Sequence, residues 1–109
     1  MLNADDPVAR RLGREEVVHG VVEAIGARLV LTNRRVVISE HGVITLDVPI
    51  DNLRLVEFDL ESHRPARVII VPEHPRHPPR ELAIEPQQYD EVASVLAELG
   101  PRIQGPQQA

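Results

Sequence analysis

The stretch that decides the fold is LVLTNRRVVISEHGV, residues 29–43. Two apolar runs rich in valine, leucine and isoleucine flank a short polar segment, TNRR (32–35). Such runs favour β-strands, and threonine followed by asparagine favours a tight turn between them. A second turn follows at EHG (40–42), where the glycine accommodates a positive φ angle. The stretch therefore predicts two antiparallel hairpins that share a middle strand at residues 36–39.

Short strand patterns continue on both sides of this stretch. The predicted strands occupy residues 15–24, 28–32, 36–39, 43–48, 53–62, 67–71 and 81–85. Over 53–62, apolar and acidic residues alternate, which is typical of a strand with one buried and one solvated face. We interpret Glu57, Asp59 and Glu61 as that solvated face, or as partners of an arginine-bearing strand, rather than as a metal or acid–base site. RVIIV (67–71) does not alternate, so both of its faces are expected to be covered.

After the last strand the spacing of apolar residues changes from two to three or four. This spacing predicts an amphipathic helix over residues 86–100, which Pro86 opens and Gly100-Pro101 ends. Seven short antiparallel strands would leave open edges, and this helix is the element suited to cover one open end. We therefore predict a mainly β fold, a seven-stranded antiparallel barrel or orthogonal sandwich capped by one C-terminal helix.

The chain of 109 residues has the length of a single domain. We divide it into a polar N-terminal segment (1–13), a folded domain (14–100) and a flexible C-terminal tail (101–109). Asp6-Pro7 suits the start of a short helical turn in the first segment. Gly20, in the middle of the first predicted strand, indicates a bulge or bend.

Four segments resemble the pleckstrin-homology (PH)-like domains of the bacterial PH and GRAM type. They are REEVVHGVVEA (14–24), RLVLTNRRVVIS (28–39), VPIDNLRLVEF (48–58) and PQQYDEVASVLAEL (86–99). The resemblance spans residues 14–100 and implies a PH-like barrel with its C-terminal helix. It also implies a binding module rather than an enzyme, because PH-like domains bind phospholipid head groups, peptides or partner domains.

Phosphoinositide-binding members of that family carry several basic residues on the first two strands and the loop between them. Here the region offers only Arg28 and His19, with Glu23 beside them. We keep an anion site made of Arg28, Arg34 and Arg35 as the alternative function, because guanidinium groups suit phosphate and carboxylate. The competing interpretation of the arginine pair is structural, with Arg34 at a hairpin tip and Arg35 paired to a neighbouring carboxylate.

Four prolines within residues 72–80 predict a loop without regular structure. Plain connecting loops are commoner, but we keep an interaction arm as the alternative interpretation, because proline holds an extended backbone ready for a partner. Its candidate residues are His74, Pro75, Arg76, His77, Pro78 and Pro79. The two histidines beside Glu73 also suggest a metal site, but their loose spacing favours a chance pair, and no metal is expected.

The composition narrows the function further. The net charge is −5, there is no cysteine, and only two residues are aromatic. These values argue against nucleic-acid binding, thiol chemistry and general adhesion to anionic membranes. Glycine-rich phosphate loops and nucleophile elbows are absent from the sequence, so we expect neither an enzyme nor a cofactor. The acidic start and the lack of a long apolar run favour a cytoplasmic location.

Taken together, these patterns predict a non-enzymatic binding module. We expect it to contact a protein partner, or other copies of itself in a homo-oligomer, through the edges of its sheet. Contact with membrane lipid through the arginines is the less favoured hypothesis, and nucleic acid is not an expected partner.

Overall fold

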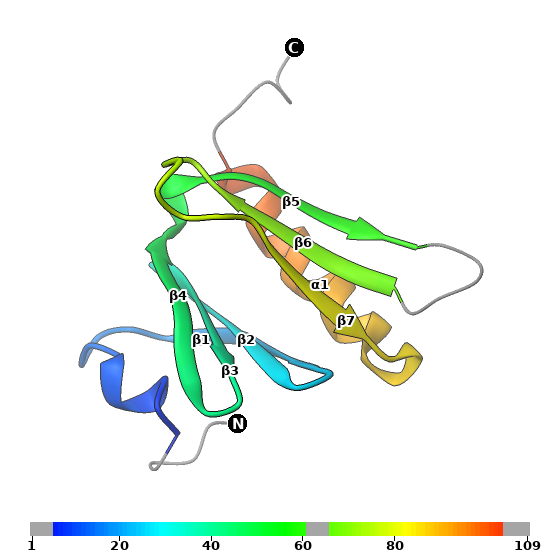
Figure 1. The fold of residues 1–109 in the computed structure, drawn as a ribbon. Helices are drawn as coiled ribbons and strands as arrows, with labels where there is room; N and C mark the ends of the chain where they lie inside the picture. Colours follow the sequence, from blue (N-terminus) through cyan, green and yellow to red (C-terminus); the bar gives the residue numbers. More distant parts are fainter. Residues whose placement is uncertain (1–5, 61–65, 104–109) are drawn as a thin grey trace.

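Seven antiparallel strands in two sheets and one helix make up the computed structural model, which describes residues 6–60 and 66–103 (Figure 1). The larger sheet has the order β1-β2-β3-β4, with β1 Val18–Ala24, β2 Ala27–Thr32, β3 Arg35–Glu40 and β4 Val43–Pro49. The smaller sheet has the order β5-β6-β7, with β5 Leu53–Asp59, β6 Ala66–Pro72 and β7 Arg80–Ile84. The helix is α1, Tyr89–Leu99. The predicted mainly β class, the strand number and the C-terminal helix are confirmed.

Short 3-10 turns connect several of these elements. They are η1 Ala9–Arg11, η2 Ile50–Asn52, η3 Pro86–Gln88 and η4 Gly100–Arg102. Turn η2 leads from one sheet to the other, and η3 and η4 flank the helix. The two sheets also touch at a second place, where Ile25 N donates a hydrogen bond to Ala83 O at 2.9 Å. None of the helices in the described residues is long and apolar enough to span a membrane.

Both hairpins predicted from residues 29–43 are present. In the β2–β3 turn, Thr32 Oγ1 accepts hydrogen bonds from the backbone N–H groups of Arg34 and Arg35, each at 3.0 Å. In the β3–β4 turn, His41 and Gly42 have φ angles of 52° and 82°. A turn with two consecutive positive φ angles matches the right-handed twist of the flanking strands. Such turns favour glycine because it adopts a positive φ angle without steric cost.

The bulge expected at Gly20 is confirmed, and it determines where the helix can pack. The pairing of β1 with β2 shifts register between Val18 and Gly20. A Cβ atom at Gly20 would lie 2.7 Å from Cγ2 of Val95 in α1, closer than any side chain can approach. The missing side chain therefore lets α1 lie directly against β1.

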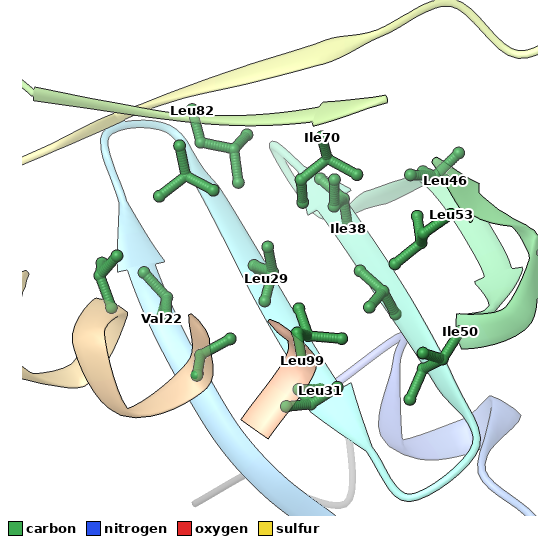
Figure 2. Packing of buried hydrophobic residues seen from close by; sticks show 14 of the residues in the cluster. Val22, Leu29, Leu31, Ile38, Leu46, Ile50, Leu53, Ile70, Leu82 and Leu99 are labelled. Atoms are coloured by element: carbon green, nitrogen blue, oxygen red, sulfur yellow. The ribbon is translucent and has the colours of Figure 1, made fainter. Parts of the chain in front are cut away.

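The main core lies between the two sheets and α1 (Figure 2). In Figure 2, Leu29 of the larger sheet points toward Ile70 and Leu82 of the smaller sheet, with Leu99 of α1 beside it. Ile103 is also buried in this core, although the sequence analysis placed it in a flexible tail. Residues beyond 103 lie outside the described residues.

A second, smaller core lies on the other face of the larger sheet. Residues 6–16, called the strap below, reach this face, and Val8 is fully buried there against Val30 and Val37. Most of the strap belongs to the segment that the sequence analysis set apart as polar. One valine and the half-buried Leu12 are enough to cover this face.

The smaller sheet has no comparable cover on its outer face within the described residues. In β6, Val68 and Ile70 are buried, whereas Ile69 and Val71 are half-buried. Leu55 of β5, which pairs with Val71, is 46% exposed. Both faces of residues 67–71 were expected to be covered. Within a single chain, the inner face is buried and the outer face is covered only in part.

The predicted strand 53–62 is shorter in the structure, since β5 ends at Asp59. Val56 and Phe58 pack against the main core as expected. Leu60 is exposed instead, because it lies past the end of the strand. Glu61 lies outside the described residues.

Candidate functional site

Arg35 lies at the centre of an ion-pair network that ties the strap to the larger sheet. Its Nε and Nη2 atoms donate to the two carboxylate oxygens of Glu16, each at 2.8 Å. Its Nη1 lies 3.2 Å from Asp47 Oδ2, and Nη2 also donates to the carbonyl of Arg11 at 2.9 Å. All three guanidinium nitrogens therefore have partners within the chain. The carboxylate partner suggested by the sequence is present.

The Glu16 carboxylate is fully buried, and every contact around it favours the charged form. Besides the bidentate pair with Arg35, it accepts hydrogen bonds from Thr32 Oγ1 at 2.6 Å and Gly13 N at 3.0 Å. The hydrogen bonds from Arg35 chiefly lower the pKa of Glu16, to about 2. The same bonds raise the pKa of Arg35. Arg35 is thus a structural anchor of the strap.

Sequence reasoning did not single out Glu16, because it lies 19 positions before Arg35. The only sequence signal for this pairing was that Glu16 is an acidic residue next to the first strand. Many strands that begin in solvent have such a residue. Only the packing of the strap turns this residue into a buried ligand of the guanidinium.

Arg28 lies at the other end of β2, and it is also paired. It forms an ion pair with Asp6 of the strap, and its Nε lies 2.9 Å from Glu23 Oε2 on β1. Arg28 precedes Thr32, which lies beside the arginine pair, by four positions. This corresponds to a distance of about 13 Å along an extended strand. The structure therefore does not bring Arg28 into one site with Arg34 and Arg35.

Arg34 differs from both neighbours in being exposed at the hairpin tip. Its side chain makes no ion pair within residues 6–60 and 66–103. It lines a cavity of about 340 Å³ together with Arg35, Asp47 and Pro49. Because Glu16 and Asp47 already neutralise Arg35, the two guanidinium groups of this cavity leave it little net positive charge.

The proline-rich loop joins β6 to β7 and is exposed from Glu73 to Pro79. Its base is held by a hydrogen bond from Glu73 N to Asn52 O at 2.8 Å. Within the loop, Arg76 N donates to Nδ1 of His74 at 3.0 Å, and His77 N donates to the His74 carbonyl at 3.0 Å. The loop is thus folded onto itself rather than extended.

The two imidazole rings of this loop do not form a metal centre with other ligands. The ring centroids of His74 and His77 are 6.3 Å apart in an edge-to-face arrangement. The described part of the chain contains no group of three or more histidine, cysteine, aspartate or glutamate side chains placed to hold a metal ion. Nδ1 of His74 already accepts a backbone hydrogen bond, which leaves only its Nε2 for other contacts.

The outer face of the smaller sheet has a charged end and an apolar end. At the charged end, Arg67 of β6 donates to Asp59 Oδ2 and to Glu81 Oε1, each at 2.8 Å. This arginine between two carboxylates is the arrangement predicted for the acidic face of residues 53–62. At the apolar end, Leu55 pairs with Val71 across the sheet.

Comparisons with known proteins identify no relative of this chain: none of the family models, curated proteins or solved structures matches it. The resemblance to PH-like domains consequently stays a prediction from the sequence. Any functional proposal depends on the geometry described above.

Proposed function

We propose that this chain is a non-enzymatic binding module that contacts a protein partner or further copies of itself. The contact surface in this proposal is the outer face of the smaller sheet, together with the edge of β5 that pairs with no strand among residues 6–60 and 66–103. The carrying observation is the apolar surface of Leu55, Ile69 and Val71, of which Leu55 is 46% exposed and the other two are half-buried.

A comparison between strands supports this proposal. Strands β2 and β3 have continuous apolar runs, and both of their faces are covered, one by the main core and one by the strap. Strand β6 has the same kind of run, but only one of its faces is covered. Continuous apolar strands are typical of sheets buried on both sides. A protein surface is the cover that would complete this pattern for β6.

The finer description of the fold also belongs to this proposal. We place the chain among the PH-like barrels or orthogonal sandwiches, which are capped by a C-terminal helix. The order of the seven strands, the helix against β1 and β5, and the hydrogen bond between Ile25 and Ala83 support this assignment. The location that we expect for the protein, from its sequence, is the cytoplasm.

The experiment is a measurement of mass in solution, by size-exclusion chromatography with light scattering over a concentration series. We expect an oligomer that Ile69→Glu dissociates, because a charge would be buried in the contact. Val43→Glu is the matched control, since Val43 is exposed on the larger sheet. A monomer at every concentration would exclude self-assembly, and equal effects of both variants would exclude this face.

The alternative function is binding of an anionic lipid head group or small anion. The observation in its favour is the exposed Arg34, which lines a cavity and makes no ion pair with the described part of the chain. Salt-sensitive binding to anionic vesicles, lost in Arg34→Ala and kept in Arg54→Ala, would support it. Absence of binding at low salt would exclude it, because surface electrostatic attraction is strongest there.

A further inference from the structure

A cavity of about 560 Å³ lies along the edge of β1, which belongs to the larger sheet and not to the sheet of the proposed contact face. Its floor is the bulged part of β1, from Val18 to Val21. Ala9 and Leu12 of the strap form one wall, and Glu91 of α1 stands on the opposite wall. We call this cavity the β1 groove.

Strand β1, at the floor of the groove, is an edge strand. Hydrogen bonds from other segments occupy only part of its outer edge in the described chain. Near its end, Glu23 N donates to Gln88 Oε1 at 3.2 Å, and Ile25 N donates to Ala83 O at 2.9 Å. Backbone amides of alternate residues in a strand point to the same side, so the amide of Val21 also points to this edge. Among residues 6–60 and 66–103, no strand pairs with this edge of β1 beside the groove, so its backbone can accept an added strand.

The two walls differ in chemistry. The strap wall is apolar, and Val18 on the floor adds exposed apolar surface. The helix wall is acidic at the groove, because Glu91 in the first turn of α1 is the helix residue that lines it. Side chains of an extended peptide alternate between two sides. A peptide lying on this edge would thus present every second side chain to the apolar wall and the others to the acidic wall.

We propose that the β1 groove binds an extended segment of a partner protein in which apolar and basic residues alternate. The segment adds to the edge of β1 through backbone hydrogen bonds, which supply affinity, while the two walls supply specificity. Its apolar side chains pack on Leu12 and Val18, and its lysine or arginine side chains face Glu91. The inference rests on the proposed binding function but uses a different surface.

The test is a titration of the isotopically labelled full chain, followed by NMR, with a short synthetic peptide of alternating valine and lysine. The matched probe is a peptide of alternating valine and glutamate. We expect saturable shifts of the backbone amides at residues 18–21 with the lysine peptide alone. N-methylation of alternate peptide amides should abolish these shifts, because it removes the donors that an added strand needs.

Two charge variants test the acidic wall. Glu91→Lys should weaken binding of the lysine peptide about fivefold, the size expected for one exposed charge pair. Asp90→Lys is the control, because it makes the same charge change in the same helical turn without lining the groove. Equal weakening in both variants would show attraction by overall charge only, which would overturn the proposal.

Other outcomes separate this inference from the proposed function. An oligomer in solution together with no shifts at 18–21 would overturn the groove proposal and leave the outer-face contact standing. Shifts confined to Ile69 and its neighbours would overturn it in the same way. Binding at 18–21 by a chain that stays monomeric would support the groove and exclude self-assembly.

Discussion

The larger sheet is buried on both faces, whereas the smaller sheet is buried on one. Val30 and Val37 of the larger sheet are fully buried under the strap, while Leu29 and Ile38 of the same strands face the main core. On the smaller sheet, the outer residues Ile69 and Val71 of the central strand β6 are only half-buried, and Leu55 of the edge strand β5 is 46% exposed. The difference shows that a few strap residues can complete a sheet from within the chain, and that β5–β7 lacks such a segment among the described residues.

The ion pairs of the two sheets differ in the same way. The Glu16 carboxylate that meets Arg35 is fully buried, whereas the Glu81 carboxylate that meets Arg67 is half-exposed. Exposed pairs contribute little to stability because water screens them, but a buried carboxylate depends on its partner. Similar arginine–carboxylate geometry thus has unequal energetic weight in the two sheets.

The largest expected difference between the two sheets is in the loss of stability when the arginine of each ion-pair network is removed. Arg35→Ala leaves the buried carboxylate of Glu16 without its guanidinium, and should lower the free energy of unfolding by about 3 kcal/mol. Arg67→Ala, in the smaller sheet, should lower it by less than about 1 kcal/mol. Urea denaturation of both variants measures the difference. Equal losses would contradict the greater weight given to the buried pair.

The next effect is a pH dependence specific to the strap of the larger sheet. Folding lowers the pKa of Glu16 from 4.5 to about 2, chiefly through its hydrogen bonds with Arg35. A lowered pKa stabilises the fold fully above pH 4.5, and this stabilisation is lost as the pH falls toward 2. We expect a loss of about 2–3 kcal/mol across this window.

Glu16→Gln is the control for that pH dependence. The variant should be less stable at neutral pH, and its stability should fall less steeply below pH 4.5, because the amide does not titrate. Denaturation curves at a series of pH values provide the measurement. An unchanged slope in the variant would show that other carboxyl groups cause the acid sensitivity.

A smaller difference is expected when the same change, valine to alanine, is made at the outer face of each sheet. Val8→Ala removes the apolar contact of the strap and should cost about 2 kcal/mol, the transfer and cavity terms for two buried methyl groups. Val71→Ala, on the uncovered face, should cost less than about 1 kcal/mol in the monomer, since its side chain is half-exposed already. Thermal or urea unfolding at low protein concentration compares them. A larger cost at Val71 would mean that this face is covered.

The smallest effect concerns the start of β1 in the larger sheet. Asn33 Oδ1 accepts a hydrogen bond from Val17 N at 2.8 Å, and Asn33 N donates to Val17 O at 2.9 Å. Asn33→Ala keeps the second bond and loses the first, so a cost of about 1 kcal/mol is expected. Amide hydrogen exchange at Val17 should become faster in the variant. Unchanged exchange there would show that the side chain does not hold the strand.

Much of the fold was predictable because its signals are local. TNRR (32–35) and EHG (40–42) specify turns through side-chain hydrogen bonds and positive φ angles, which depend on adjacent residues alone. The change to helical spacing after residue 85 is equally local, and the helix predicted over 86–100 is present as α1, although it begins at Tyr89 after the 3-10 turn Pro86–Gln88. The same kind of signal marked the bulge at Gly20.

The candidate sites were predictable only as a set of residue types. The sequence presents Arg28, Arg34 and Arg35 as three similar cations, and the structure gives two of them partners and leaves one exposed. Those partners come from the strap and from neighbouring strands. Which carboxylate meets which arginine depends on how distant segments pack, and no spacing rule contains that information.

By itself, the sequence determined the mainly β class, the seven short strands, their turns and the closing helix, because backbone preferences and apolar periodicity act between near neighbours. Tertiary structure alone decided that a polar-looking strap covers the larger sheet, that Glu16 is buried against Arg35, and that the edge of β1 beside Glu91 pairs with no strand among the described residues. The physical reason is that an apolar pattern in the sequence indicates which face of a strand is buried. Which segment covers that face depends on packing among residues far apart in the chain.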